Sequence, residues 1–391
     1  MSPPLDRPPP AVRALGWTSF LTDLSSEAIY PLLPAFVRGL GGTSLDIGLI
    51  DGAANAVAAV VRLPSGALSD RIGRRPLVLL GYGFSAIVRP LMGMIATPAQ
   101  AILIRAADRF GKGIRTAPRD ALVTDLVAGD ERGRAFGHIR SLDHLGAAVG
   151  PLVAMLFLLV MPGRERTLFL LSILPGLATL AVIARFVHDP PRRTTAPRAI
   201  AAPLTRSQAW LLACVATWSL GAASEQFLLL RAAELGTPPA LVPLVWFVTS
   251  LAKSLASGRA GRVADSVSPR IVLAAGWLLF AAAYAGLAWA PNLAITIPLV
   301  VAVGIAHGVA EPAERTLVAS LAPAGRQGGS FGWYALVQGL MALPAGIIAG
   351  WLWDRGVGGP AIAFATTATL ALVASGLLAV VPLRAVEPRS G

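Results

Sequence analysis

Charged side chains recur inside segments that are otherwise apolar, and these are the residues that could do chemistry. Seven of the charged residues in 98–127 share one face: Arg105, Asp108, Arg109, Lys112, Arg115, Arg119 and Asp120. At about 100° per residue they fall within an arc of about 140° on a helix, so one face is polar. A charge at mid-membrane costs about 2.5–3.5 kcal/mol, so this face must line water or meet partners. Binding and moving an ion or a charged solute is chemistry that such a face can perform.

Residues 12–38 supply possible partners for that face. Five polar residues share one side of a helix there: Ser19, Asp23, Ser26, Glu27 and Tyr30. At about 1.5 Å per residue, Asp23 and Lys112 both lie near the middle of two oppositely directed helices. A lysine ammonium can lose its proton there, whereas a guanidinium stays charged. We hypothesise that Lys112, Asp23 and Glu27 form a cluster that changes partners when substrate or a proton binds. The alternative is a permanent ion-pair network that fixes helix register.

Residues 293–321 carry a second polar face, with His307, Glu311, Glu314 and Arg315 within an arc of about 100°. Residues 207–234 add Glu225. The predicted cavity is therefore basic on its amino-terminal side, apart from the acids of the first segment, and more acidic on its carboxy-terminal side. The predicted substrate and proton pathway contains Asp23, Glu27, Tyr30, Arg109, Lys112, Arg115, Arg119, Asp120, Glu225, His307, Glu311 and Glu314.

The elements that position these residues are membrane-spanning helices. Of the 391 residues 55% are hydrophobic and 14% charged, far from the roughly 45–50% and about 25% of soluble domains. Apolar stretches of about 20 residues suit helices that cross a hydrocarbon core of about 30 Å. Twelve spans are predicted, at residues 12–38, 45–68, 76–96, 98–127, 133–160, 167–187, 207–234, 238–263, 269–290, 293–321, 327–352 and 359–382.

Basic residues fall mostly on one set of the connecting loops. The positive-inside rule therefore places both termini in the cytoplasm of a multi-pass protein of the cell (inner) membrane. The net charge of +12 is scattered, which argues against a nucleic-acid partner. The single cysteine, Cys214, excludes an internal disulfide and a multi-cysteine metal cage. We expect a monomer in the lipid bilayer, with a small molecule or an ion as substrate.

The sequence also repeats itself at an offset of 195 residues. Residues 121–123 match residues 316–318, Phe136-Gly137 match Phe331-Gly332, and Gly66 and Asp70 match Gly261 and Asp265. Matches at one offset of about half the chain indicate two duplicated halves. The predicted fold is an all-α membrane protein with two pseudo-symmetric six-helix bundles, at residues 1–187 and 207–391. Residues 188–206 form a proline-rich cytoplasmic linker.

One loop carries a dense motif between the second and third spans. Its fixed positions are Gly66, Asp70, Arg71, Gly73, Arg74 and Arg75, and their spacing resembles the signature G-x-x-x-D-R-x-G-R-R of the major facilitator superfamily of transporters in full. Gly66 would allow close helix approach and Gly73 a tight turn. Asp70 could meet an arginine or a helix N-terminus of the other half, as a cytoplasmic gate. The alternative is a set of charges that only fixes topology.

Two further patterns resemble the drug:proton antiporters of that superfamily. Residues 109–115 are similar to R-x-x-Q-G-x-G, with Lys112 in place of glutamine and Arg115 in place of the second glycine. Residues 146–151 resemble the start of G-x-x-x-G-P-x-x-G-G, although ordinary small-residue helix packing also explains them. The resemblance implies the major facilitator fold, in which spans one, four, seven and ten line the cavity.

The energy source is inferred from what the sequence lacks. It contains no P-loop pattern, so we expect no cofactor and a proton gradient as the driving force. The resulting prediction is a secondary transporter that exports a small charged or amphiphilic solute by alternating access. Alternatives are a facilitative uniporter or importer of an organic anion, and a metal-ion exporter, whose ligands the sequence does not identify. A membrane-embedded enzyme is disfavoured because no nucleophile–base motif supports it.

Overall fold

The computed structural model describes residues 8–127, 132–189, 204–222, 224–322, 327–356 and 358–380. For residues 132, 133, 258, 259, 261–266, 327 and 328 it describes the backbone alone. Most of the predicted linker, the second copy of the loop motif at Gly261 and Asp265, and both chain ends therefore lie outside what can be described. In the described part every regular element is helical.

The helices of the amino-terminal half follow the predicted spans in order. They are α1 (Pro10–Ile29), η1 (Tyr30–Leu32), α2 (Leu33–Gly39), α3 (Ser44–Ile72), α4 (Arg74–Val88), η2 (Arg89–Met94), α5 (Pro98–Leu126), α6 (Arg132–Val160), α7 (Glu165–Leu171) and α8 (Ile173–Phe186).

The carboxy-terminal half does the same, with α9 (Arg206–Gly221), α10 (Gln226–Glu234), η4 (Pro239–Leu241), α11 (Val242–Ser266), α12 (Pro269–Trp289), α13 (Leu293–Ser320), α14 (Gln327–Trp353) and α15 (Gly359–Val380). The largest boundary difference in either half is at α3, which continues to Ile72 where residue 68 was predicted.

Several spans are broken where the sequence analysis expected one continuous helix. Tyr30-Pro31 and Arg89-Pro90 each begin a 3₁₀ turn, because proline lacks the N–H that continues an α-helix. The seventh span breaks between α9 and α10, next to Ser224. These breaks turn polar groups of the backbone and side chains toward the interior of the protein.

Nine of the described helical segments are long and apolar enough to cross a membrane. The predicted spans that fall outside this set are residues 12–38, 98–127 and 207–234. These contain the charged and polar faces described above, which lower their hydropathy. The same helices supply pathway residues.

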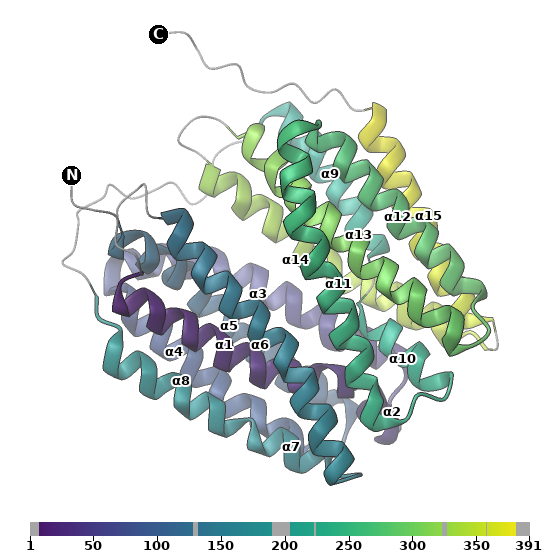
Figure 1. Cartoon of the computed structure of the whole chain (residues 1–391), viewed down its shortest axis with the longest axis horizontal. Coiled ribbons are helices and arrows are strands. Elements are labelled where there is room, and N and C mark those ends of the chain that lie inside the picture. Colours follow the sequence, from purple (N-terminus) through teal and green to yellow (C-terminus); the bar gives the residue numbers. More distant parts are fainter. Residues whose placement is uncertain are drawn as a thin grey trace.

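The two halves have the same helix pairings, which confirms the duplicated architecture. Within the first half α1 packs on α6 and α8, α3 on α5, and α4 on α5 and α8; within the second half α9 packs on α14 and α15, α11 on α13, and α12 on α13 and α15 (Figure 1). Between the halves, α3 packs on α14 and α6 on α11. Each pairing in one half has its counterpart 195 residues later.

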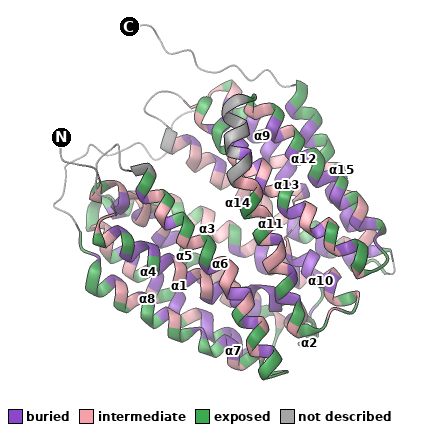
Figure 2. Ribbon diagram, viewed as in Figure 1, coloured by how far each residue is buried: buried purple, intermediate pink, exposed green. Residues whose placement is uncertain are grey.

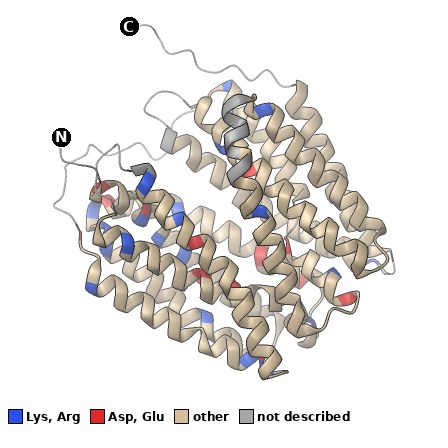
Figure 3. Cartoon of the chain, in the orientation of Figure 1, with Lys and Arg blue, Asp and Glu red and all other residues tan. Residues whose placement is uncertain are grey.

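The outer surface of the assembly suits a lipid environment. Exposed apolar side chains such as Leu103 (69% exposed) and Val160 (78%) are spread over the outward faces of the helices (Figure 2). Charged residues collect at helix ends and between the bundles (Figure 3), whereas α15 has none. Apolar side chains that point outward are stable in a bilayer, because lipid hydrocarbon solvates them and separates them from water.

The halves are pressed together on the side away from the chain ends, which we call the far side. It contains the connections from Gly39 to Ser44 and from Trp353 to Gly359. A Cβ atom added to Gly48 of α3 would lie 2.0 Å from the carbonyl oxygen of Gly346 in α14. Such close backbone approach requires glycine at both positions. We call the opposite side, where α1 begins and α15 ends, the terminal side (Figure 1).

Candidate functional site

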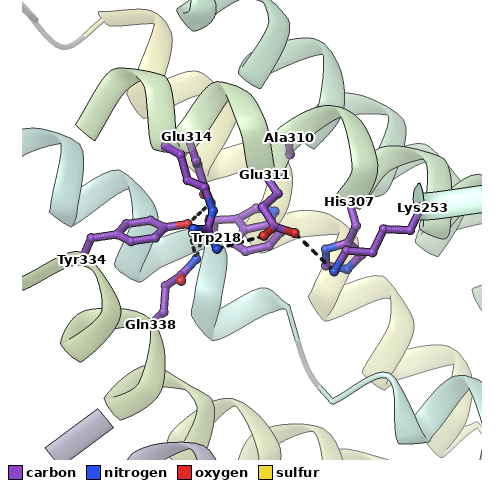
Figure 4. Close-up of a pocket in the computed structure, with 9 residues that line it drawn as sticks. Trp218, Lys253, His307, Ala310, Glu311, Glu314, Tyr334 and Gln338 are labelled. Carbon is purple, nitrogen blue, oxygen red and sulfur yellow. Dashed lines mark hydrogen bonds and ion pairs between the residues drawn. The ribbon is translucent and has the colours of Figure 1, made fainter. Parts of the chain in front are cut away.

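A cavity of about 240 Å³ lies inside the carboxy-terminal half (Figure 4). Helices α9, α11, α13 and α14 supply its lining, which consists of Trp218, Lys253, His307, Ala310, Glu311, Glu314, Arg315, Tyr334 and Gln338. The predicted polar face of α13 thus points into a real cavity. We call this set the C-half pocket.

Three exposed charges form one cluster in the C-half pocket. The Nζ of Lys253 lies 3.5 Å from Glu311 Oε2, and the Nη2 of Arg315 lies 3.0 Å from Glu311 Oε1. Their side chains are 39%, 42% and 50% exposed, for Lys253, Glu311 and Arg315 respectively. Lys253 was not predicted as a site residue. The sequence feature that could have identified Lys253 is the rarity of its residue type, because the chain has two lysines.

Glu314 is the buried acid of the same pocket, with 2% of its surface exposed. Its Oε2 accepts hydrogen bonds from the hydroxyl of Tyr334 (2.6 Å) and from Nε2 of Gln338 (3.4 Å). Its Oε1 has no hydrogen-bond partner among the described residues. The sequence analysis missed Tyr334 and Gln338, which α14 brings to this acid.

His307 and Glu225 meet at the edge of the pocket. His307 Nε2 lies 3.7 Å from Glu225 Oε1, and its ring packs edge-on against Trp218 and Phe280, with centroids 5.6 and 5.1 Å away. Glu225 sits at the break between α9 and α10. Two of the residues predicted for the carboxy-terminal side of the pathway therefore lie close together, one on α13 and one at the break between α9 and α10.

In the amino-terminal half the charges predicted around Lys112 lie within electrostatic range of one another. The charges acting on Asp23 include Lys112, Glu27 and Asp143, and those acting on Lys112 include Asp23 and Arg109. Lys112 is solvent-exposed although it lies mid-helix, so it faces a space that water can reach.

Glu27 connects this cluster to the other half. Its Oε2 accepts a hydrogen bond from Trp246 Nε1 of α11 (2.9 Å), and its Oε1 accepts one from Ser26 (3.1 Å). Trp246 also packs against the ring of Tyr30, with 4.9 Å between centroids. Glu27, which was predicted to form a cluster with Lys112 of α5, therefore also connects the two bundles.

Arg119 and Asp120 lie nearer the terminal side. Arg119 bonds Ser19 of α1 at 2.9 Å and Asp120 at 3.0 Å, and Arg62 of α3 lies 3.9 Å from Asp120. These contacts join α1, α3 and α5 at one level of the first bundle.

Arg115 is placed differently from the other predicted pathway residues. It is 6% exposed, its Nη1 donates to Ser85 of α4 at 2.8 Å, and its guanidinium lies over the ring of Tyr82 at 4.5 Å. It meets partners between α4 and α5 and does not line the water-accessible space. The predicted polar arc of about 140° on α5 is so wide that its residues face different neighbouring helices.

A chain of buried ion pairs crosses the first half, and we call it the buried chain. Arg89 Nη2 lies 3.0 Å from Asp108 Oδ1, Arg105 Nη1 lies 3.8 Å from Asp108 Oδ2, and Arg105 Nε lies 3.8 Å from Asp51 Oδ1. Asp51 Oδ2 then accepts from Tyr30 (2.7 Å) and, across the halves, from Ser224 (2.6 Å). The sequence analysis missed Asp51 and Arg89, and Arg89 is the one charged residue in the predicted span 76–96.

The loop motif on the terminal side is bonded within its own half. Gly73 has φ +104°, which confirms the predicted tight turn. Asp70 pairs with Arg74, and Arg74 also contacts Asp125 Oδ2 at 3.4 Å. Among the described residues, the ion pair that Asp70 forms is with Arg74 of its own half. Arg71 lies in the same turn.

Two other positions of the motif refine its chemistry. The backbone N–H of Arg75 donates to Asp189 Oδ1 at 2.8 Å, and its Nη2 donates to the carbonyl of Ala184 at 3.1 Å. At Gly66 a Cβ would lie 3.5 Å from that of Ala117, which is ordinary contact. The predicted close approach at Gly66 is therefore wrong for this structure.

The described residues contain no group of three or more His, Cys, Asp or Glu side chains arranged to hold a metal ion. The site is instead a set of ion pairs and hydrogen bonds on two facing bundles. Paired six-helix bundles with charged inner faces define a membrane transporter.

Comparisons with known proteins identify the family. The profile of the Major Facilitator Superfamily matches residues 15–231, more than half of the chain, and the chain belongs to this superfamily of transporters, not to an enzyme family. It is 29% identical over 377 residues to an uncharacterised MFS-type transporter of Methanocaldococcus jannaschii, covering 94% of this chain and 93% of that protein.

Two further relatives extend the likeness. Multidrug resistance protein MdtH of Salmonella paratyphi B is 24% identical over 358 residues, covering 86% of this chain and 85% of MdtH. The structure of a bacterial homologue of the human lysosomal transporter Spinster, inward-facing and unoccupied, superposes with a TM-score of 0.75 at 15% identity, over 95% of this chain and 94% of the homologue. The latter likeness concerns the fold.

Proposed function

We propose that this transporter exports a small charged or amphiphilic solute from the cytoplasm in exchange for protons. The observation that carries the proposal is Glu314. It is a buried carboxyl group beside the exposed charges of the C-half pocket, and its Oε1 lacks a hydrogen-bond partner among the described residues. A carboxyl group at membrane depth can bind and release a proton during a transport cycle.

Alternating access is supported by the asymmetry of the contacts between the halves. Bonds from Glu27 to Trp246 and from Asp51 to Ser224 join the halves near mid-membrane, and Asp354 bonds Arg38 and Ser44 at the far side. On the terminal side Asp70 is paired within its own half. In our proposal the terminal side is cytoplasmic, and closing it lets Asp70 reach the second half while the far-side contacts break.

The direction of transport is proposed from two supports. The positive-inside distribution of basic residues assigns the terminal side to the cytoplasm of the cell membrane. MdtH, a relative over most of the chain, is a multidrug resistance protein by name. In the proposed cycle the solute enters the C-half pocket from the cytoplasm, and proton binding at the far side drives the return.

The experiment that tests this function uses purified protein in sealed liposomes. A thermal-shift screen of metabolites, drugs and divalent ions first supplies a transported solute. Uptake is then measured with and without a pH gradient, with the membrane potential clamped by valinomycin and potassium. We expect accumulation inside the liposomes against the solute gradient only when the interior is more acidic than the medium, because an antiporter moves protons out as the solute moves in. Equal uptake with and without the pH gradient would show a facilitative uniporter and refute the proposal.

A variant set locates the proton-binding group. Glu314→Gln should abolish accumulation driven by the pH gradient and keep solute exchange at equal pH, because the amide retains the shape and not the titrating group. Asp23→Asn, Glu27→Gln and Lys112→Ala test the first-half cluster in the same assay, and wild-type coupling in all three would remove that cluster from the mechanism. Full coupling in Glu314→Gln would contradict the assignment of the proton to Glu314.

A further inference from the structure

We propose that the C-half pocket binds a small organic anion through its carboxylate, and that Glu311 is the internal carboxylate which the ligand replaces. The inference names the solute class for the transport function proposed above and in that sense rests on it. Binding to the purified protein tests it separately from transport.

The first support is the position of Glu311 between two cations from different helices. Lys253 of α11 approaches one of its oxygens to 3.5 Å and Arg315 of α13 approaches the other to 3.0 Å. A carboxylate is therefore already held in a two-cation cradle. Guanidinium groups bind carboxylates through paired N–H donors, so the cradle has the donors that a ligand carboxylate needs.

The second support is that these pairs are hydrated and therefore exchangeable. The three side chains of the cradle are 39–50% exposed. Exposed ion pairs contribute little to stability, because water solvates both partners when they separate. Glu311 can leave the cations at small cost, unlike the carboxylates of the buried chain.

The third support is the charge balance that a ligand would meet. Among the lining residues the accessible charges are Lys253 and Arg315 against Glu311, a net charge of +1, and Glu225 lies outside the lining, beside His307, with its side chain 24% exposed. Glu314, the other acid of the pocket, is 2% exposed and engaged by Tyr334 and Gln338. His307 faces Glu225 and aromatic rings. Once Glu311 swings away, the accessible groups favour an anion over an organic cation.

Shape restricts the ligand further. Trp218 and Tyr334 provide aromatic parts of the lining, and Ala310 adds a small apolar side chain to it (Figure 4). The volume of about 240 Å³ is below the roughly 300–1,000 Å³ of pockets for drug-sized ligands. The pocket therefore suits a carboxylate on one compact ring or a short apolar body.

The test compares three probes of matched shape by isothermal titration calorimetry of the full chain in detergent. Benzoate is the anion, benzylamine the cation and benzamide the neutral control. We expect benzoate to bind the wild type, and Glu311→Gln to tighten benzoate about tenfold by removing the internal competitor, a change that corresponds to about 1.4 kcal/mol. Lys253→Met should remove benzoate binding.

The opposite results overturn the inference. A cation site would lose benzylamine affinity in Glu311→Gln, and unchanged, weaker or undetectable benzoate binding in that variant would equally refute an anion cradle. Glu165→Gln on α7 removes the same charge outside the pocket and should leave the benzoate affinity as in the wild type. Glu311→Asp, which keeps the competing carboxylate, should show less tightening than Glu311→Gln.

The outcomes separate this inference from the proposed function. Tighter benzoate binding in Glu311→Gln, with solute transport that ignores the pH gradient, would leave the anion cradle standing and remove proton coupling. Proton-driven transport of a solute by a protein that binds none of the anionic probes would remove the cradle alone.

Discussion

The two halves of the molecule use ion pairs in contrasting environments. In the first half the buried chain links Arg89, Asp108, Arg105 and Asp51, whose side chains are 4–9% exposed. In the second half the cradle of Lys253, Glu311 and Arg315 is 39–50% exposed. Duplicated bundles with the same helix pairings therefore carry one dry network and one hydrated cluster.

The contrast separates structural charges from exchangeable ones. A buried ion pair that loses one partner leaves an uncompensated charge away from water, so its members are held in place. A hydrated pair can open and close at little cost. We infer that the buried chain fixes the packing of α3, η2 and α5, while the C-half pocket can rearrange around a solute.

The sharpest way to break this comparison is Asp108→Asn. The change leaves Arg89 without a buried countercharge and Arg105 with Asp51 alone, and we expect the free energy of unfolding to fall by about 3–5 kcal/mol. Unfolding in sodium dodecyl sulphate, followed by circular dichroism, measures the loss.

Glu311→Gln is the matched change in the second half. Its pairs are hydrated, so the same measurement should give a loss within about 1 kcal/mol. Equal losses for Asp108→Asn and Glu311→Gln would show that burial does not distinguish the two networks.

The sequence predicted the helices and the duplication because both depend on local pattern. Apolar length gave the spans, and a fixed offset gave the repeat. The proximity of Lys112 to Asp23 followed from helix rise along antiparallel spans. Gly73 was predicted as a turn residue, and its φ of +104° agrees.

The composition of the site depended on how helices are rotated against each other, which one helix does not reveal. Lys253 and Tyr334 reach α13 from α11 and α14, and only packing between helices brings them there. Arg115 shares the polar arc of α5 but turns to α4. Asp70 pairs with Arg74 of its own half, and the spacing of the motif does not reveal which partner Asp70 takes.

Ser224→Ala is expected to have an effect of medium size, because Ser224 connects the buried chain to the second half. The change removes the 2.6 Å bond to Asp51 that crosses between the halves. A hydrogen bond to a charged group contributes about 1.5–3 kcal/mol, so the population that is open on the far side should rise. Tyr30→Phe removes the 2.7 Å bond to the same oxygen within one half, and it should leave that population unchanged.

Spin labels across the far side measure the opening. Met161 and Trp289 are 49% and 84% exposed and follow α6 and end α12, so cysteines there in a Cys214→Ala background report the separation of the halves. We expect a longer-distance population in Ser224→Ala. Its appearance in Tyr30→Phe to the same extent would mean that Asp51 acts through the first half alone.

The smallest effect is expected for the exposed contact at the far side, which tests whether hydrated pairs are weak in both halves. Asp354 accepts from the backbone N–H groups of Ser44 and Leu45, at 3.0 and 3.3 Å, and lies 3.4 Å from Arg38. Asp354→Asn keeps an acceptor for the helix N-terminus and removes the ion pair, so it should cost about 0.2–1 kcal/mol. Asp354→Ala also removes the cap and should cost about 0.5–2 kcal/mol. Asp354→Asn could instead open the far side as widely as Ser224→Ala in the same distance measurement. That result would mean that an exposed ion pair holds the halves together. Exposure would then no longer explain which charges can exchange partners.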